Sequence, residues 1–545
     1  MSYIRFTAKC TFAMLFLVGT IFASTSPTIT VASPIAGTVG NPTYFDATAS
    51  TSSCAAGISA VRIYTAPGVI AFTTNSPHLE TFLKLKPTTY NVVIQAWDNC
   101  GGVAKFPIKI AVSGAAGVHI FLPTSTSSTT PVHVAASAEN SACAGGISAL
   151  RIYPSSGVNA FTSSGATLDA FINLLPGTYS AIAQAWDTCG HVFKTPFTIS
   201  STGGAFGKFL YIAQNDDDSI AEFQLSAGTL INSNGSNNPP PQFSVPAAPN
   251  TFAVDPPGNI AYAGLSDGRI SIFDINRANG RLFSKGTVSA PGTGPASVTV
   301  DRSGNFLFVA EEGSNDVSSY SINRSSGALT FIGTVPAASK PIAIITDWSG
   351  HFVYVSNNSS DNVSGYAINT MNGKLTPVPG SPYLASSQPL SIGATAKVVY
   401  TLNGGDGTAS GYNINGTSGS LTPAPGSPFQ MSECCGTPNM MDLDPIHNLL
   451  LFSAIGFTFG TDNIQTTTIQ SNGSLYGGSA IGGVYGPTSV ALDPSYQFVY
   501  TCEVDGYTGQ PQVISIKYAP NGTGSIFSGP LARPAANPIQ IAVSR

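Results

Sequence analysis

The sequence has 545 residues, of which 9% are charged, and its formal net charge is −5 at pH 7. A chain of this length exceeds one ordinary hydrophobic core, so several domains are expected. The sparse charge leaves no strongly basic surface, so neither nucleic acid nor an acidic membrane is expected as a partner. The 57 glycines and 39 prolines favour turns over helix interiors, and hydrophobic residues at 42% supply core material. This composition predicts an all-β protein and argues against a disordered chain.

The first 25 residues have the order of a secretory signal peptide. Arg5 and Lys9 precede the apolar stretch 11–22, and Ala23 and Ser24 supply small residues after it. The alternative, a buried first strand, explains the flanking charges less well. No later segment reaches the ~18 apolar residues of a membrane-spanning helix. We therefore expect residues 1–25 to be a signal peptide and the mature protein to be secreted, either extracellular or periplasmic.

Two stretches then repeat at a constant offset of 89 residues. Each has one cysteine early and one late, with a tryptophan three residues before the second cysteine. In an exported chain these cysteines are expected to pair as Cys54–Cys100 and Cys143–Cys189. Each bridge would close a loop worth roughly 4 kcal/mol in the chain-entropy model. Metal binding is the competing interpretation, but the spacing lacks a second close cysteine pair, so no metal is expected.

The strand-like alternation around these cysteines suits a small β-sandwich. The repeats resemble bacterial immunoglobulin-like domains, with boundaries expected at residues 26–113 and 117–201. The resemblance implies spacer or adhesive modules.

A longer repeat fills residues 205–545 and predicts a seven-bladed β-propeller. One unit holds four short strands joined by turns, and two markers count seven units. The first is the proline that begins each unit, and the second is the turn glycine before each last strand. The markers are Pro249, Pro295, Pro341, Pro389, Pro438, Pro487 and Pro538, with Gly228, Gly280, Gly327, Gly373, Gly419, Gly473 and Gly522. The segment 538–543 lacks the rest of a unit and 209–213 lacks a first strand, so we expect these two to pair and close the ring.

Segments such as 303–310, 315–322 and 373–377 resemble the lactonase-type seven-bladed propellers. This family includes 6-phosphogluconolactonase-like proteins and fungal carboxymuconate cyclases. The resemblance implies a ligand near the central channel and lactone hydrolysis as an activity. Enzymes of this type tend to have a histidine where a first strand begins, but Lys340-Pro341 and Gly294-Pro295 stand there in this chain.

Four charged residues are the candidate ligand-binding residues at the channel mouth: Glu311, Lys340, Glu433 and Glu503. A lysine close to a carboxylate could assist ring opening or proton transfer. Solvated surface charge is the alternative for each of them, and the sequence does not show whether any two meet.

Other polar residues of the repeats have structural explanations. His351 and His447 are expected to be turn residues on the opposite face, and the aspartates at 255, 301, 347, 444 and 493 are expected to form Asx turns. The run 215–218 reads as a solvated turn rather than a calcium site. We expect Cys502 to bridge to Cys434 or Cys435, with the third thiol buried.

Two functions remain. The first is a non-catalytic binding, adhesion or scaffold protein, which is favoured by an exported chain without a recognisable catalytic set. Its propeller face would bind a carbohydrate, small-molecule or protein ligand. The alternative is a secreted lactonase or related hydrolase. No cofactor motif is found, so no cofactor is expected, and the protein is expected to be a monomer.

Overall fold

The computed structural model describes residues 26–52, 54, 56–123, 132–154, 161–172, 174, 176–202, 207–231, 241–431, 437–455, 463–482, 484–504, 511–527 and 538–544. All regular elements within these ranges are β-strands, as the composition predicts. Residues 1–25, which are predicted to be a signal peptide, and Glu433, Cys434 and Cys435 lie outside them. No helix in the described ranges is long and apolar enough to span a membrane.

The first unit is a sandwich of two sheets. A three-stranded sheet has the order β1 (Thr28–Ser33), β3 (Thr43–Ser50) and β6 (His78–Leu83). A five-stranded sheet has the order β2 (Gly37–Val39), β8 (Val103–Val112), β7 (Thr89–Asp98), β4 (Ile58–Ala66) and β5 (Val69–Thr74). Alternate side chains of both sheets form one buried core, which includes Phe45, Ile63 and Ile94.

The second unit repeats this arrangement. One sheet has the order β13 (Thr167–Ile172), β10 (Val132–Glu139) and β9 (Gly117–Leu122). The other has the order β12 (Phe161–Ser164), β11 (Ile147–Tyr153), β14 (Gly177–Asp187) and β15 (Val192–Ser201). Val134, Ile152 and Ala183 belong to the core between them.

Each sandwich contains the expected disulfide. Cys54 bonds to Cys100 with Cα atoms 5.7 Å apart, and Cys143 bonds to Cys189 with Cα atoms 6.0 Å apart. Both bridges span 46 positions of sequence. Disulfides of this kind persist in oxidising compartments, so they indicate a protein that works outside the cytoplasm.

Seven antiparallel sheets follow within the described residues, each with its strands in the order of a propeller blade. The first combines β46 (Pro538–Ser544), β16 (Phe209–Gln214), β17 (Ser219–Ser226), β18 (Thr229–Ile231) and β19 (Gln242–Ser244). The next two are β20 (Pro249–Val254), β21 (Ile260–Leu265), β22 (Arg269–Ile275) and β23 (Leu282–Ser289), then β24 (Pro295–Val300), β25 (Phe306–Glu311), β26 (Asp316–Ile322) and β27 (Leu329–Pro336).

The remaining four sheets continue around the ring. They are β28 (Pro341–Thr346), β29 (Phe352–Asn357), β30 (Asn362–Ile368), β31 (Leu375–Pro377) and β32 (Tyr383–Leu384); β33 (Pro389–Ala394), β34 (Val398–Asn403), β35 (Thr408–Ile414), β36 (Leu421–Pro423) and β37 (Phe429–Gln430); β38 (Thr437–Asp444), β39 (Leu449–Ile455), β40 (Asn463–Ile469) and β41 (Leu475–Ile481); and β42 (Ser489–Leu492), β43 (Phe498–Val504), β44 (Pro511–Tyr518) and β45 (Gly524–Ile526).

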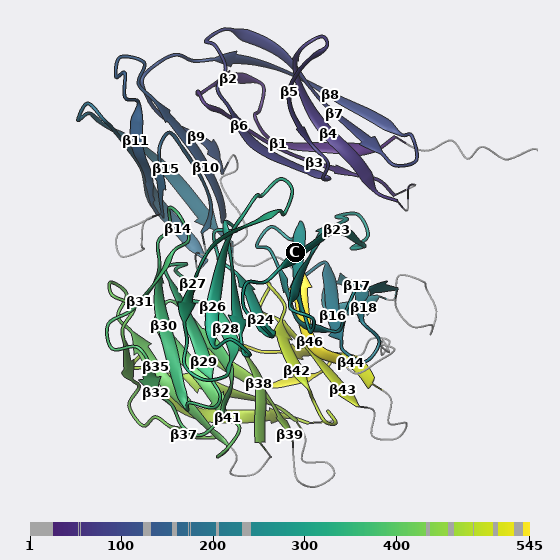
Figure 1. Cartoon of the computed structure of the whole chain (residues 1–545), viewed down its shortest axis with the longest axis vertical. Helices are drawn as coiled ribbons and strands as arrows, with labels where there is room; N and C mark the ends of the chain where they lie inside the picture. Colours follow the sequence, from purple (N-terminus) through teal and green to yellow (C-terminus); the bar gives the residue numbers. More distant parts are fainter. Residues whose placement is uncertain are drawn as a thin grey trace, which may run out of the picture.

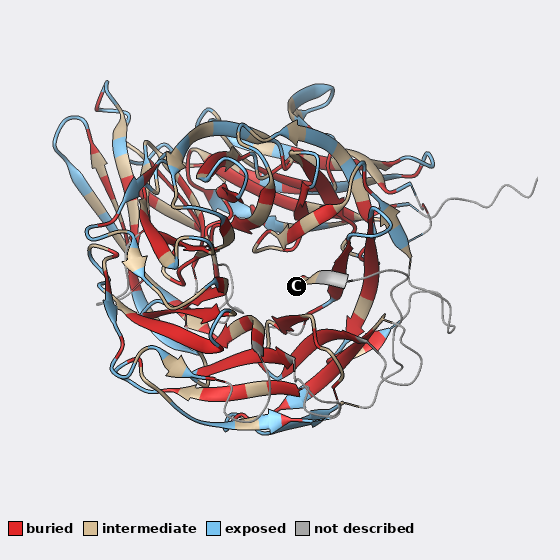
Figure 2. Cartoon of the chain, turned by 60° about the horizontal axis from the view of Figure 1, so that its bottom comes forward, coloured by how far each residue is buried: buried red, intermediate tan, exposed pale blue. Residues whose placement is uncertain are grey.

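The inner strands of these sheets form a closed circle. β20, β24, β28, β33, β38, β42 and β46 each contact the next, and β46 contacts β20. Figure 2 looks onto this ring, in which the sheets are buried along most of their length. Closure depends on the predicted pairing of distant segments, because β46 runs antiparallel to β16 with Phe209 opposite Ser544. β16 is therefore paired on both sides, by β46 and β17, and lacks the open edge that is the usual site of unwanted strand addition.

The two sandwiches lie at one side of the propeller (Figure 1). They contact the turns between first and second strands and between third and fourth strands. Thus Asn305 donates a side-chain hydrogen bond to the backbone oxygen of Asp169 at 3.3 Å, and Thr74 donates to the backbone oxygen of Ser325 at 3.1 Å. The opposite face, which holds the turns that contain Gly313 and Gly405, is the face predicted to bind ligand.

A buried charge cluster joins all three units. Arg324 of the propeller lies 2.9 Å from Glu80 of the first sandwich and 3.1 Å from Asp169 of the second. His133 contacts the same two carboxylates, at 3.2 Å and 2.7 Å. Burial would lower the pKa of His133, but the charge of Asp169 and hydrogen bonds to both carboxylates raise it to about 9. His133 is therefore a cation at neutral pH, and this junction pairs two cations with two carboxylates.

Candidate functional site

The structure places the predicted open-face residues in different environments. Glu311 at the end of β25 and Glu503 near the end of β43 are both buried, whereas Lys340 is exposed. Glu503 accepts hydrogen bonds from the backbone of Tyr485 at 2.8 Å and from the side chain of Gln512 at 2.6 Å. No ion pair joins Lys340 to a carboxylate within the described ranges. The fourth residue, Glu433, lies outside the described residues, so the role of this set stays a prediction.

Lys340 has a backbone role that the sequence did not indicate. It immediately precedes the first residue of β28 and has a φ of 58°. Gly294 and Gln388 occupy the same place in neighbouring blades, with φ values of 68° and 53°. The Asn315 side chain accepts a hydrogen bond from the Lys340 backbone N–H at 2.7 Å, which holds this turn. The turn therefore explains the position of Lys340 without any use of its ammonium group.

Glu311 is a predicted residue whose buried carboxyl has a raised pKa. Burial, together with the charge of Asp316, raises the pKa of Glu311 to about 7. Its carboxylate accepts a hydrogen bond from the Ser314 hydroxyl at 3.4 Å and lies beneath the turn at Gly292. A carboxyl with this pKa changes charge in the neutral range.

We expect the substitution Glu311→Gln to stabilise the protein at pH 8 and to have little effect at pH 4. The folded-state pKa lies above the ordinary value, so wild-type stability falls as pH rises from about 4.5 to about 7. The amide of glutamine is neutral at every pH. After allowance for solvent screening, we expect it to raise the free energy of unfolding by roughly 1–2 kcal/mol at pH 8. Thermal unfolding of both proteins across this range checks it. A difference between them that does not change with pH would contradict the assignment.

The expected cysteine bridge at β43 is wrong. Cys502 is a free, fully buried thiol that packs in the core between the last and first blades. Burial raises its pKa to about 12. The side chain is therefore a small core residue, and the strand pairing of β43 with β42 and β44 leaves it facing this core.

A central channel of about 380 Å³ lies among the inner strands. Most of its lining is small or apolar, as in Ala253, Val298 and Ile344. Four charged side chains also line it: Asp442 on β38, Arg302 in the turn after β24, and the turn aspartates Asp255 and Asp493. Burial raises the pKa of Asp442, and the nearby charge of Arg302 opposes this rise, although the two make no direct ion pair within the described ranges. The channel lining thus includes three carboxyls and one guanidinium but, among the described residues, no imidazole or amine.

The turns between first and second strands have the predicted Asx geometry. Asp255 accepts hydrogen bonds from the backbone N–H groups of Asn259 and Ile260, at 2.7 Å and 2.9 Å. Asp301 makes the equivalent bonds one blade further on. These aspartates therefore hold turns and do not form a carboxylate ring.

A larger cavity, of about 880 Å³, lies where the second sandwich meets the last two blades. Pro176 and Thr202 line it from the sandwich side. The propeller contributes the turn residues after β38 and β42 and the end of β44. These residues are Ile446, His447, Ser495, Tyr496, Gln497, Lys517 and Tyr518. The volume is within the range of ligand pockets, so this cavity can hold a small molecule.

His447 is the one histidine of this cavity, and a buried carboxylate orients it. Its Nδ1 donates to Oδ2 of Asp444 at 2.6 Å. The Tyr518 hydroxyl donates to the same oxygen at 2.9 Å, and Oδ1 accepts the backbone N–H groups of Ile446 and His447. Asp444 is fully buried, whereas 22% of the His447 side chain is exposed. The carboxylate fixes the tautomer in which Nε2 carries the lone pair, and that atom is the general base of aspartate–histidine pairs.

Tyr496, in the wall of the same cavity, has a backbone conformation that other blades give to glycine. It is the third residue after the turn aspartate, as Gly258, Gly304 and Gly350 are in their turns. Its φ is 56°, beside 73°, 76° and 73° for these glycines. A bulky residue in this region costs about 1–2 kcal/mol. Strain of this kind gathers at functional sites, and Tyr496 also lines the central channel, so it separates the two hollows.

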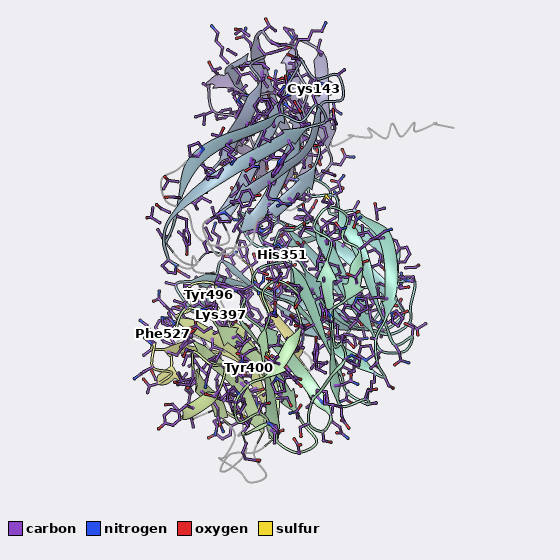
Figure 3. All side chains as sticks on the ribbon, turned by 90° about the vertical axis from the view of Figure 1, so that its left-hand side faces the viewer. Cys143, His351, Lys397, Tyr400, Tyr496 and Phe527 are labelled. Carbon is purple, nitrogen blue, oxygen red and sulfur yellow. A yellow bond between two sulfur atoms is a disulfide. The ribbon has the colours of Figure 1, made fainter. Side chains whose placement is uncertain are left out.

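Figure 3 shows Tyr496 and His351 on the side of the propeller that faces the sandwiches. His351 is a turn residue, as predicted, and its Nδ1 lies 2.9 Å from the backbone oxygen of Ser349. Its ring packs 5.7 Å from that of Phe161 in the second sandwich. Only His447 therefore combines a turn position with an oriented imidazole and a cavity. A sequence signal for it exists, because its turn and that of Tyr496 lack the glycine found in the turns of Asp255, Asp301 and Asp347.

Comparisons with known proteins agree with this fold. Residues 283–386 match the family described as lactonase, 7-bladed β-propeller. A comparison with curated proteins found no match. A candidate 6-phosphogluconolactonase from Bacteroides uniformis has 14% identity and a TM-score of 0.51, with 62% of this chain and 100% of that chain covered. The periplasmic gluconolactonase of Pseudomonas aeruginosa has 13% identity and a TM-score of 0.51, with 62% of this chain and 99% of that chain covered. The chain therefore carries a propeller similar in fold to these structures, with a lactonase-type sequence over residues 283–386.

Proposed function

We propose that this protein is an extracytoplasmic lactone hydrolase that acts on sugar lactones. The single observation that carries the proposal is the Asp444–His447 pair, which opens into an 880 Å³ cavity of a propeller with a lactonase-type segment. The disulfides support a place outside the cytoplasm, and one propeller of similar fold is a periplasmic gluconolactonase. This proposal favours the hydrolase over the non-catalytic binding role that the sequence first indicated.

The chemistry follows from the base. His447 Nε2 accepts a proton from a water molecule, and the hydroxide so formed bonds to the lactone carbonyl carbon. The ring C–O bond then breaks, the imidazolium returns the proton to the leaving oxygen, and an open hydroxy acid results. Lys517 lines the cavity and supplies a positive charge for the developing oxyanion and for the carboxylate of the product.

The finer architecture belongs to the same proposal. Residues 1–25 would be removed on export, and the sandwiches at 26–113 and 117–201 would be immunoglobulin-like domains. The second of them supplies Pro176 to the cavity, so in this proposal it completes the site and is more than a spacer. The mature chain would act as a monomer.

The test is hydrolysis of a panel of sugar and aromatic lactones by the mature protein, followed by acid release. We expect turnover of sugar lactones above background, a loss of about 10²–10⁴-fold in kcat for His447→Gln, and no change for Lys340→Ala. The matched control His351→Gln changes the histidine of the corresponding turn after β28, which does not line the 880 Å³ cavity, and should keep full activity. Absence of turnover on every lactone would refute the function. Turnover that depends on Lys340 but not on His447 would move the chemistry to the open face.

A further inference from the structure

The two sandwiches display the same side chains on their outer sheet faces. In the first, Arg62 on β4 lies opposite Gln95 on β7, and Gln95 lies opposite Lys105 on β8. The second repeats this row with Arg151, Gln184 and Lys194 on β11, β14 and β15. A tryptophan lies next to each row, and a tyrosine follows each arginine two positions later. These residues are Trp97 and Tyr64 in the first sandwich and Trp186 and Tyr153 in the second. We call these sets the Arg–Trp faces.

Core packing does not require this repetition. The residues that alternate with the Arg–Trp faces point inwards, and Val61, Ile94, Leu150 and Ala183 are fully buried. The outward residues are half-buried or exposed, and the exposed Val103 is matched by Val192 at the same place. Three other outward pairs differ, Asn91/Ser180, Val93/Ile182 and Lys109/Thr198, whereas Ala60/Ala149 and Pro107/Pro196 are also shared. Surface residues that are the same in both sandwiches are expected where the surface binds a partner.

Each face holds its arginine flat against the aromatic rings. The Arg62 guanidinium lies 5.1 Å from the centre of the Trp97 ring, and that of Arg151 lies 5.6 Å from Trp186 and 5.8 Å from Tyr153. The Nε of Arg62 has no hydrogen-bond partner within the described structure. Arg151 also donates to the hydroxyls of Thr162 and Tyr153, at 2.6 Å and 3.3 Å. Stacking holds each guanidinium in place, so each face offers an anionic ligand the positive charge of its arginine rather than a free Nε donor.

The faces are cationic in a protein that is acidic overall. The outward residues of the first include Lys105 and Lys109 beside Arg62, and those of the second include Lys194 beside Arg151. None of the outward residues on the described strands of these two faces is acidic. An anionic partner is therefore complementary to both faces, whereas the whole chain has a net charge of −5.

We propose that the Arg–Trp faces bind an acidic polysaccharide, a polymer whose sugar units carry carboxylates. The aromatic rings would contact the apolar faces of the sugars, the guanidinium and ammonium groups would pair with carboxylates, and Gln95 and Gln184 would bond to hydroxyl groups. The disulfides place the protein outside the cytoplasm, where such polymers occur and nucleic acids are not the usual ligands. Two equal faces on one chain would raise the affinity for a long polymer. The proposal is independent of lactone hydrolysis.

The experiment measures binding of the full mature chain to polygalacturonate, with the fully methyl-esterified polymer as the neutral probe. We expect binding to the acidic form alone, and it should weaken as salt rises. The double variant Lys105→Gln/Lys194→Gln removes one charge from each face without touching the stacked arginines, and we expect about tenfold weaker binding. The matched control is Lys374→Gln/Lys397→Gln, two exposed lysines of the propeller, which should bind as wild type does.

Three outcomes would overturn the proposal. They are equal binding to the esterified polymer, unchanged binding by the Lys105/Lys194 variant, and a preference for single-stranded DNA over polygalacturonate. The thermal midpoint of each variant is compared with that of wild type, so that loss of binding is not mistaken for loss of fold. Lactone turnover is measured on the same samples, because it should stay unchanged if the two sites are separate.

Discussion

Replacement of Arg324 by methionine is expected to lower stability by about 3–5 kcal/mol in the cooperative unit that joins the sandwiches to the propeller. Methionine keeps much of the side-chain volume but removes the cation between Glu80 and Asp169. Burial alone would raise the pKa of Glu80, and the charge of Arg324 and the hydrogen bond from His133 hold it well below its usual range. Without Arg324, His133 would be the one cation in ion-pair contact with both carboxylates among the described residues, and the Tyr44 hydroxyl would still donate to Glu80. Calorimetry should show a lower first transition and a wider separation between the sandwich and propeller transitions.

The matched control for this variant is Arg269→Met. Arg269 also pairs with a carboxylate, Asp267, but both side chains are about one-third exposed. Surface pairs of this kind contribute little, so this control should unfold as wild type does. The double variant Glu80→Gln/Arg324→Met should recover part of the loss, because it removes one of the unpaired charges. Wild-type stability in Arg324→Met would show that the junction does not hold the units together.

Asp444→Asn is expected to reduce lactone turnover by about 10²–10⁴-fold while the fold is retained. The Asn carbonyl can still accept the backbone N–H groups of Ile446 and His447, so the turn survives. Its amide now donates to Nδ1 of the imidazole, which moves the proton to Nε2. The ring stays in place but in the tautomer that cannot accept a proton from water.

The readout is kcat across pH together with the imidazole nitrogen signals in NMR. Tyr518→Phe provides the comparison, because it removes a hydrogen bond to Asp444 but leaves the bond to His447. We expect that variant to lose less than tenfold in kcat. If Asp444→Asn kept wild-type activity and the shifted tautomer were seen, His447 would not be the base.

The blades could be predicted from sequence because their determinants are local. Pro249, Pro295, Pro341 and Pro389 are the first residues of β20, β24, β28 and β33, as their spacing predicted. Proline begins a strand without loss of a ladder hydrogen bond, so it marks the start of each unit. Closure of the ring was also predictable. The C-terminal segment is a first strand without a blade and the first sheet lacks a first strand, so each supplies what the other lacks.

The cavity could not be predicted because its walls come from distant parts of the chain. His447 reads as a turn residue by itself, and only packing against Pro176 and Thr202 encloses it. The same limit applies to Arg324, whose neighbours Glu80 and Asp169 lie in other units. The disulfides differ, because each repeat holds one early and one late cysteine, so the sequence itself indicates which two cysteines bond.

The pairing of β16 with β46 also sets an order of events during synthesis. Phe209 is synthesised long before its partner Ser544. Six blades can therefore form while the first sheet still lacks its inner strand, β46. Contacts this far apart in sequence form slowly, because a long loop has to close before they gain stability. Until then β16 presents a bare edge that other chains can join. Export in an extended form, with folding delayed until the whole chain has crossed, would bring both segments into the same compartment at the same time.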